Sequence, residues 1–498
     1  MGAGWDRYRA LDRRTPVIVG VGRASQAPDA TAGGRDALGL MIQAAEAAGA
    51  DGGAGDVLRR LDLVAVPEGT TRYRDAGRSV DQAVGSGNAR SVAMALGVPQ
   101  QALFNHCYEA MTEGRAERAL VVGGEGAARE ARGRRAGLTL EATEAGPERD
   151  PDERHVPTGD IVDAVEMAAG MVEPPVCYAL IDSALRYAEG YGPDEHLVQI
   201  SELWARFAGV AAGFPHAAFP LERSARWLAT ASEANRPIAF PYNKWHCSQM
   251  YVDQAAAVLM TTLGAAEDDG VDPRQVVFPA VALQSSHSVP VTRRREMHRW
   301  PAMEILGRAA SQHLGRLLSE LPHAELYSCF PAAVRVQQRA LGLPIGGTPT
   351  ITGGMTFAGG PFNNFVLQAT VAMVERLRHH PGDLGLVTTV SGFLNKPGLA
   401  VYSTEPVARG LLVGDLAAAA EAATEQVPTV GDHAGPATVA AYTVASDRSG
   451  GRRTVVVGDV PSGGRCVAVS ADPAIASEAT ARELIGVTVT VGGGEFHL

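Results

Sequence analysis

Apolar residues along the chain form two recurring patterns, an unbroken run and a stripe at helical spacing. The run at 15–22 (TPVIVGVG) predicts a buried strand, and the spacing over 36–49 predicts a helix after it. Apolar positions from 103 to 111 lie on one face of a second helix, and the run at 119–124 (ALVVGG) follows as a strand. Alternation of this kind predicts an α/β protein.

The same order returns in the second half of the chain. A helical stripe over 365–377 precedes the apolar run at 384–392 (LGLVTTVSG). The unit of helix, apolar strand and glycine therefore occurs once in each half, which predicts a duplicated α/β architecture. Strands that alternate with helices also predict parallel sheets covered on both faces.

Two stretches depart from this pattern. Residues 127–172 are rich in Gly, Arg, Asp and Glu, and predict a long surface excursion between the halves. After a break at 424–436, short alternating strands predict a small β-barrel of the oligonucleotide/oligosaccharide-binding type. The strands are expected at 437–444, 454–460, 466–470 and 486–491, with one helical piece at 473–484.

Charge and cysteine content exclude several classes of partner. The chain has 44 Lys and Arg against 55 Asp and Glu, so its formal charge is −11, whereas nucleic acid and anionic membranes need a basic surface. No apolar run reaches the roughly 18 residues of a membrane span. The five cysteines are scattered and form no CxxC pair, which indicates reduced thiols. We expect no nucleic-acid partner, no membrane partner and a cytoplasmic location.

The common cofactor and metal motifs are missing. Gly20 and Gly22 follow an apolar run, but the third glycine of a dinucleotide fingerprint is absent, so a plain strand and turn is favoured. GxxxxGK[ST], GxSxG, HExxH and paired Cys/His spacings do not occur. The sequence therefore predicts neither a metal site nor a resident cofactor.

Three local clusters carry candidate chemistry. His246 and Cys247 are neighbours in WHCSQ, and a thiolate nucleophile would need the two side chains to converge, although neighbours on a strand point to opposite faces. Tyr327 opens YSCF at an expected strand end, where it is either an active-site phenol or a core aromatic. The glycine-dense loop 352–364 either cradles a ligand with backbone N–H groups or packs backbone against backbone. Cys107 lies on a buried helical stripe and is interpreted as a core residue.

Together these segments resemble the thiolase superfamily, in particular the sterol-carrier-protein-type branch and the actinobacterial group called thiolase-like protein type 1. The C-terminal strands resemble the additional domain of the type 1 group. The likeness covers nearly the whole chain and is carried by RTPVIVGVG at 14–22, ALVVGGEG at 119–126, DQAAAVLM at 253–260, YSCF at 327–330, GGMTFAGGPFNN at 353–364 and VTTVSG at 387–392.

The resemblance implies two αβαβα halves, an excursion that binds coenzyme A, and chemistry on acyl thioesters. It places the N-terminal half at 1–126 and 220–275, the excursion at 127–219, and the C-terminal half at 276–415. The OB-like barrel follows at 432–498.

The reactive residues of the family are replaced in this sequence. The nucleophilic cysteine is matched by Gly97, the Asn or His of the second fingerprint by Tyr327, the GHP histidine by Gly360, and the CxG cysteine by Val390. Claisen chemistry needs a thiolate, a base and oxyanion donors, and neither glycine nor valine supplies them. Ordinary thiolase activity is therefore not expected.

The leading hypothesis is an acyltransferase-like enzyme that acts on a coenzyme A or related thioester without a cysteine-bound intermediate. The alternatives are a retro-aldolase-type lyase, which Tyr327 would serve, and a non-catalytic acyl-CoA binder or scaffold. The thioester is the only expected ligand, and the chain is expected to be a monomer or homodimer. Candidate catalytic residues are Tyr327, His246, His287 and Cys247, and candidate substrate-binding residues are Ser328, Cys329, Gly359, Gly360 and Ser391.

Overall fold

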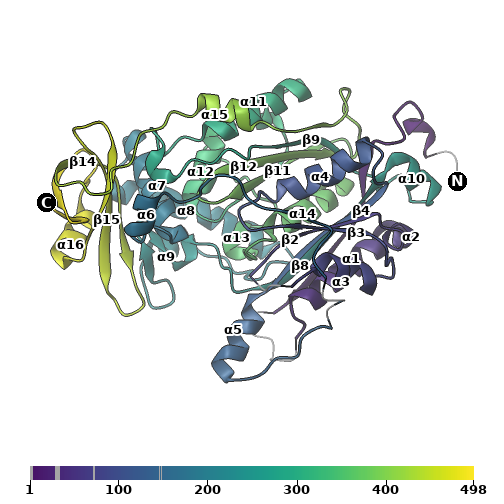
Figure 1. Ribbon diagram of the computed structural model, residues 1–498, viewed down its shortest axis with the longest axis horizontal. Coiled ribbons are helices and arrows are strands. Elements are labelled where there is room, and N and C mark those ends of the chain that lie inside the picture. The colour runs from purple at the N-terminus through teal and green to yellow at the C-terminus, as the bar shows by residue number, and fades with distance from the viewer. Residues whose placement is uncertain (1–3, 28–33, 71–72, 145, 147–148) are drawn as a thin grey trace.

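Two stacked sheets with helices between and outside them form the body of the molecule, and a small barrel lies at the end opposite the N-terminus (Figure 1). This computed structural model describes residues 4–27, 34–70, 73–144, 146 and 149–498. The other positions fall within the expected N-terminal half and excursion, and lie outside the described residues.

Both sheets are mixed, so the expectation of parallel sheets is wrong. In the first, β8 runs antiparallel to both β1 and β4. In the second, a tight turn after β11 reverses the chain, so that β12 must return antiparallel. The first sheet has the order β1 (Pro16–Gln26), β8 (Asp253–Thr262), β4 (Arg118–Gly126), β2 (Leu63–Pro67), β3 (Arg90–Met94), β5 (Glu153–His155). The second has the order β10 (His323–Glu325), β11 (Leu384–Ser391), β12 (Lys396–Ser403), β9 (Phe278–Gln284), β13 (Leu412–Asp415).

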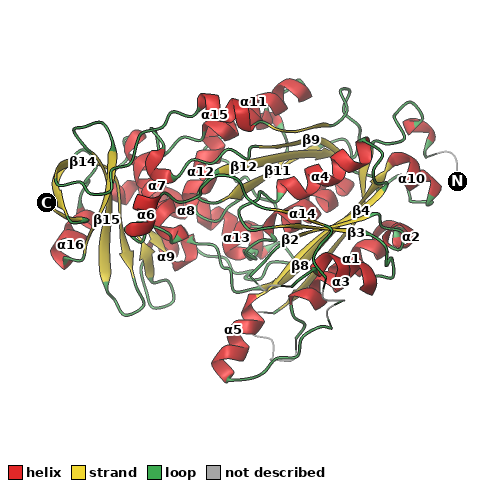
Figure 2. Cartoon of the chain, viewed as in Figure 1, coloured by secondary structure: helices red, strands yellow, loops and turns green. Residues whose placement is uncertain are grey.

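Helices complete five layers of the αβαβα kind that the resemblance implies (Figure 2). The two predicted amphipathic helices, α4 (Gln101–Thr112) and α14 (Phe365–His379), lie between the sheets and contact both. Their apolar faces are buried, and Cys107 is a fully buried core residue. The outer layers contain α1 (Ala37–Ala50), α2 (Gly55–Leu58) and α3 (Ala76–Ala83) on one side, and α11 (Pro301–Leu314), α12 (Pro331–Ala340) and α15 (Ala417–Ala423) on the other.

Gly20 and Gly22, the two glycines of the incomplete dinucleotide fingerprint, allow a helix to pack closely. A Cβ atom on Gly22 would lie 2.1 Å from the carbonyl oxygen of Ala44, and one on Gly20 would lie 2.2 Å from that of Ala48. These two glycines let α1 approach β1 at backbone distance, which accounts for them without a nucleotide.

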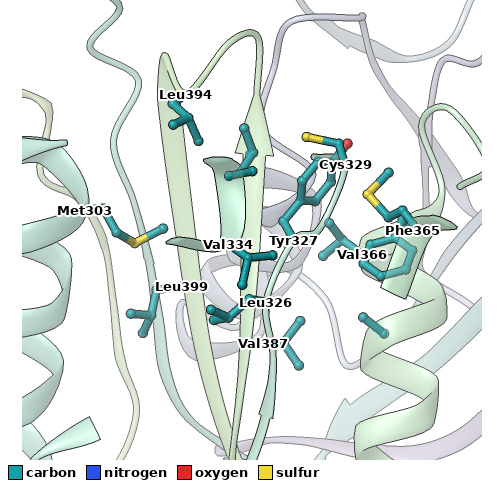
Figure 3. Packing of buried hydrophobic residues seen from close by; sticks show 14 of the residues in the cluster. Met303, Leu326, Tyr327, Cys329, Val334, Phe365, Val366, Val387, Leu394 and Leu399 are labelled. Carbon is teal, nitrogen blue, oxygen red and sulfur yellow. The ribbon is translucent and has the colours of Figure 1, made fainter. Parts of the chain in front are cut away.

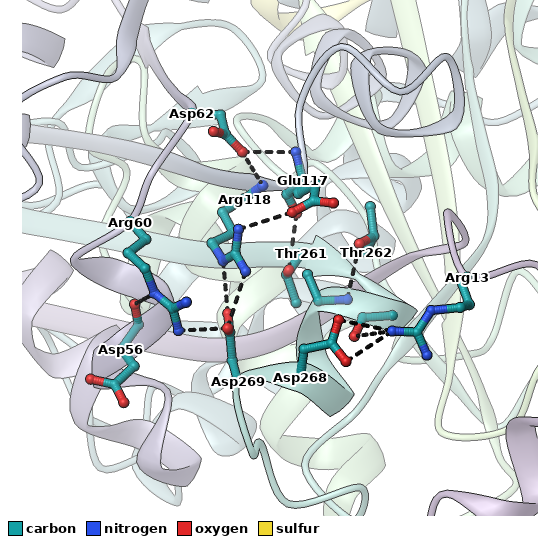
Figure 4. A network of polar contacts seen from close by, with 12 residues as sticks. Arg13, Asp56, Arg60, Asp62, Glu117, Arg118, Thr261, Thr262, Asp268 and Asp269 are labelled. Carbon is teal, nitrogen blue, oxygen red and sulfur yellow. Dashed lines mark hydrogen bonds and ion pairs between the residues drawn. The ribbon is translucent and has the colours of Figure 1, made fainter.

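An ion-pair network fixes the end of the first sheet where β4 begins (Figure 4). Arg118 Nε donates to Asp269 Oδ2 at 2.7 Å, and Asp62 Oδ2 accepts from the backbone N–H groups of Glu117 and Arg118 at 2.8 and 2.9 Å. The carboxyl ends of the parallel strands lie at the opposite end of this sheet, which leaves that end for a ligand site.

The excursion contains more ordered structure than its composition indicates. Its second part forms two long helices, and Tyr178 and Trp204 on them are fully buried. The helices of the excursion are α5 (Ala127–Ala136), α6 (Ala164–Ala168), α7 (Pro174–Ala188) and α8 (Pro193–Ala212). Helix α9 (Ala225–Ala229) follows the excursion, α10 (Leu263–Asp268) follows β8, and α13 (Gly354–Phe357) lies in the glycine-dense loop.

The predicted C-terminal barrel is confirmed. Five strands close a ring because β14 pairs with both β15 and β17. Around the ring these are β14 (Gly435–Ser446), β15 (Arg452–Asp459), β16 (Arg465–Ser470), β18 (Glu495–His497) and β17 (Thr488–Gly492), with α16 (Pro473–Ala481) between β16 and β17. The barrel shares its sheet with the body, because β6 (Pro237–Ala239) pairs with β14 and β7 (Tyr242–Asn243) pairs with β6.

Among the helices formed by described residues, none combines the length and the apolarity that crossing a bilayer requires.

Candidate functional site

Segments far apart in the sequence meet at the beginning of α4. The carbonyl oxygen of Gly97 accepts hydrogen bonds from Ser391 Oγ at 2.9 Å and from Lys396 Nζ at 3.1 Å. Gln100 Nε2 donates to Asn363 Oδ1 at 3.1 Å, which ties the same turn to the glycine-dense loop. The structure thus brings Gly97 next to Ser391, the neighbour of Val390, and ties the same turn to the glycine-dense loop.

Tyr327 lies two residues after the last residue of β10 in the second sheet. Its N–H donates to Thr388 Oγ1 at 2.8 Å, and its ring packs edge-on against Phe365 with centroids 5.8 Å apart (Figure 3). Burial raises the pKa of the phenol well above its ordinary value. Within the described part of the chain the hydroxyl has no hydrogen-bond partner. The phenol of Tyr327 therefore stays protonated near neutral pH.

Ser328 and Cys329 hold neighbouring loops together. Ser328 Oγ accepts from the N–H of Met355 at 3.0 Å, and the carbonyl oxygen of Cys329 accepts from the N–H of Ser248 at 2.9 Å. Burial raises the pKa of the Cys329 thiol to about 12. The side chains of both residues are buried, and the thiol is protonated near neutral pH.

His246 and Cys247 do not form a nucleophile pair. His246 ends a single 3-10 turn rather than a strand, and its Nδ1 accepts from the N–H of Asn243 at 3.2 Å. Its Nε2 then carries the proton and donates to Ser201 Oγ on α8 at 3.0 Å. Burial lowers the pKa of this fully buried imidazole to about 3 and raises that of the Cys247 thiol. His246 thus faces α8 as a neutral structural group.

His287 lies elsewhere, beyond β9. It lines a cavity of about 230 Å³ next to α11, together with Arg294, Arg299 and Asn395. Burial lowers its pKa, and its Nε2 has no hydrogen-bond partner among the described residues. No contact recorded between described residues joins His287 to Tyr327 or His246, so the structure does not group these three side chains.

Glycines 359 and 360 are packed against protein. A Cβ atom on Gly360 would lie 1.9 Å from Ser248 Oγ, and its N–H already donates to the carbonyl oxygen of Gln249 at 3.0 Å. Gly359 has a φ of +104°, and a Cβ there would lie 2.5 Å from Gln254 Oε1. At both positions the structure favours the packing interpretation of the loop.

The comparisons with known proteins agree with this arrangement. Residues 419–495 match the family described as the thiolase-like protein type 1 additional C-terminal domain. The structure is similar to a monomeric SCP2-thiolase like protein type 1 from Mycobacterium smegmatis, with 27% identity and a TM-score of 0.81, over 98% of this chain and 99% of that chain. The chain has a thiolase-like fold with this additional domain.

More distant similarities show the fold alone. The dimeric peroxisomal thiolase of Saccharomyces cerevisiae is 13% identical with a TM-score of 0.55, over 80% of this chain and all of its own. The Ltp2-ChsH2(DUF35) aldolase is 16% identical with a TM-score of 0.54, over 79% of this chain and 99% of its own. A search of curated proteins gave no match.

Glu325 was missed by the sequence analysis. This carboxylate ends β10 and is fully buried, with burial raising its pKa to about 7. It accepts from the hydroxyls of Thr350 and Thr352 at 2.9 and 3.0 Å, and from the N–H of Ile351 at 2.7 Å. The signal was an acidic residue at the end of a strand, two positions before Tyr327. In this thiolase-like fold it anchors the start of the glycine-dense loop.

Two groups of side chains, brought together from distant segments, have metal-ligand character. His106, Glu153 and His155 form one, and His323, His380 and Asp383 form the other; within each, the ligand atoms lie within 4.8 Å of one another. In the first group Arg90 already forms an ion pair with Glu153, which weakens the attraction for a cation. Sequence spacing does not reveal either group, because each draws on residues from separate segments.

Proposed function

We propose that this chain binds an acyl thioester of coenzyme A or a related carrier at the beginning of α4. Any acyl transfer or carbon–carbon bond step there proceeds without a cysteine-bound intermediate. The thiolase-like fold and the convergence of Gly97, Ser391, Lys396 and Tyr178 support the position of the site. Tyr178 contributes by donating from its hydroxyl to the carbonyl oxygen of Gly392 at 3.1 Å.

The proposal rests on one observation. At two glycines that the resemblance matches to reactive residues of the family, neighbouring atoms occupy the space that a larger side chain would need. Gly97 has a φ of +95°, and a Cβ there would lie 3.0 Å from Pro157 Cβ. At Gly360 the corresponding atom would collide with Ser248 Oγ. The structure around these positions is thus built for glycine, and the resemblance places the nucleophile and the GHP histidine there. Cysteine-based Claisen chemistry therefore has neither its residues nor the room for them.

The experiment combines binding with turnover. Calorimetric titration with a series of acyl-CoA thioesters should show binding, whereas acetoacetyl-CoA thiolysis should be negligible. Thiolysis at the roughly 10 per second of a median enzyme, abolished by Cys247→Ala, would overturn the proposal and make Cys247 the nucleophile. Cys466→Ala, which alters a buried thiol of the barrel, is the matched control.

A second candidate function is retro-aldol cleavage of a hydroxyacyl thioester, and Tyr327 is the observation that favours it. A phenol that stays protonated can donate to a developing oxyanion, and the fold is shared with the Ltp2-ChsH2(DUF35) aldolase. Cleavage of 3-hydroxyacyl-CoA compounds that is lost in Tyr327→Phe would support this function. Binding without any cleavage would leave an acyl-CoA binder or scaffold.

The assembly that we propose is a monomer in the cytoplasm, with the thioester as its only ligand. Strand β5 comes from the excursion and covers the outer side of β3 at the edge of the first sheet. Covered edges discourage pairing between chains. The Mycobacterium smegmatis protein is also described as monomeric. Light scattering coupled to gel filtration tests this directly, and a stable dimer would contradict it.

A further inference from the structure

Lysine is almost absent from this chain. Only two of its 44 lysine and arginine residues are lysines, Lys244 and Lys396. Lys244 is exposed, with its Nζ 5.5 Å from the centre of the Trp245 ring. Lys396 is only 1% exposed. Arginine supplies the other 42 of these positions, so a lysine kept in a buried position at the site points to a property that arginine lacks. The ability to lose its proton and act as a nucleophile is that property.

Lys396 occupies the centre of the convergence described above. It begins β12 directly opposite Ser391 on β11, and its Nζ donates to the carbonyl oxygen of Gly97. Among the described residues no carboxylate forms an ion pair or hydrogen bond with Lys396. An ammonium group held by one neutral acceptor lacks a compensating charge. Burial accordingly lowers the pKa of Lys396, which increases the fraction of neutral amine.

A cavity lies beside this turn, on the side of the first sheet. Leu96, the residue before Gly97, lines a cavity of about 650 Å³ with Val66 and Ala93, at the carboxyl ends of β2 and β3. Gly97 itself is partly exposed and carries no side chain that would cover the amine. The exposed segment 157–160 lies over the turn, since Pro157 is the nearest neighbour of a Cβ at Gly97.

We propose that Lys396 is an amine nucleophile that forms an imine with a ketone or aldehyde ligand. The lone pair of the neutral amine adds to the carbonyl carbon while a proton moves from nitrogen to oxygen, which gives a carbinolamine. A proton taken up from solvent by the carbinolamine hydroxyl lets water leave and gives the iminium ion, and return of a proton from nitrogen to solvent gives the imine. Attack on a thioester would instead leave a stable amide, so the reacting group is a ketone or aldehyde carbonyl. The inference goes beyond thioester binding and does not require it.

The test uses acetylacetone with the full-length protein at neutral pH. A 1,3-diketone condenses with a neutral amine to a conjugated enaminone, which absorbs in the near ultraviolet and adds a fixed mass. Peptide mapping then separates Lys396 from Lys244 and from the N-terminal amine. We expect Lys396 to react at least tenfold faster than Lys244 in the folded protein, and both to react at similar rates in urea. Equal or slower reaction of Lys396 in the folded protein overturns the inference.

Two variants serve as controls. Lys244→Arg should retain the rapid reaction, because Lys396 is then the single lysine. Lys396→Arg keeps the charge but removes the nucleophile, and should lose the reaction while keeping its circular dichroism spectrum. If Lys396→Arg does not fold, the rate in Lys244→Arg still decides the question. Acyl-CoA binding that persists without lysine labelling would overturn only this inference, whereas labelling without acyl-CoA binding would overturn only the proposed function.

Discussion

Gly353, at the start of the glycine-dense loop, allows this loop to lie against α8. Its φ is +95°, and a Cβ there would lie 2.3 Å from Ala211 Cβ and 2.6 Å from the Cα and N atoms of Ala211. In Gly353→Ala the left-handed backbone costs about 1–2 kcal/mol, and crowding against a helix backbone costs about 1–3 kcal/mol. We therefore expect the free energy of unfolding to fall by about 2–5 kcal/mol.

Urea denaturation followed by circular dichroism measures this loss, and Gly342→Ala is the matched control. Gly342 has a φ of +65° and open space around it, so its substitution reports the backbone cost without crowding. The excess loss in Gly353→Ala over Gly342→Ala is the crowding contribution. Equal losses would refute the reasoning, because the loop would then move away from α8 without cost.

Three further predictions follow from other contacts. The pKa of Glu325 is about 7 in the folded protein against an ordinary 4.5, so folding favours the protonated carboxyl. The free energy of unfolding should therefore fall by about 3 kcal/mol as pH rises from 4.5 to above 7. Urea titrations at these pH values should show a smaller fall in Glu325→Gln, and an unchanged fall would contradict the assignment. Gly360→His should not create acetoacetyl-CoA thiolysis, even combined with Ser248→Gly to make room, and measurable turnover would show that the site still supports thiolase chemistry. Arg465 is buried and donates to the backbone carbonyl oxygens of Arg294 and Arg295, so Arg465→Met should lower stability by about 2–4 kcal/mol. Thermal melting checks this, and an unchanged melting temperature would mean that the barrel docks by other contacts.

Hydrophobic periodicity was sufficient for the long elements of the fold. The strands at 16–26 and 384–391 and the helices at 101–112 and 365–379 were all predicted, because each buries a continuous face. Strand β18 was missed, since three residues are too few to show a period. The antiparallel course of β12 depends on a turn, and a pattern within one strand carries no information about it.

The sequence indicates little of the candidate site, because neither side-chain direction nor long-range contacts can be seen in a local motif. His246 and Cys247 are adjacent, yet a 3-10 turn directs the histidine toward α8. The contact between Gly97 and Lys396 joins residues 299 positions apart, so no local motif indicates it. In the sequence, only the rarity of lysine draws attention to Lys396, and this rarity is a property of the whole chain rather than of a motif.

The contact between α7 and β14 has a consequence for synthesis of the chain on the ribosome. The N–H of Tyr442 on β14 donates to Ser183 Oγ on α7 at 3.1 Å, across 259 positions of sequence. A nascent chain therefore completes α7 long before the strand that covers it, and domains generally fold in the order in which they emerge. During that interval a helix face made for burial remains in water, where it favours aggregation or chaperone binding. A chain stopped before 435 would keep that face uncovered permanently.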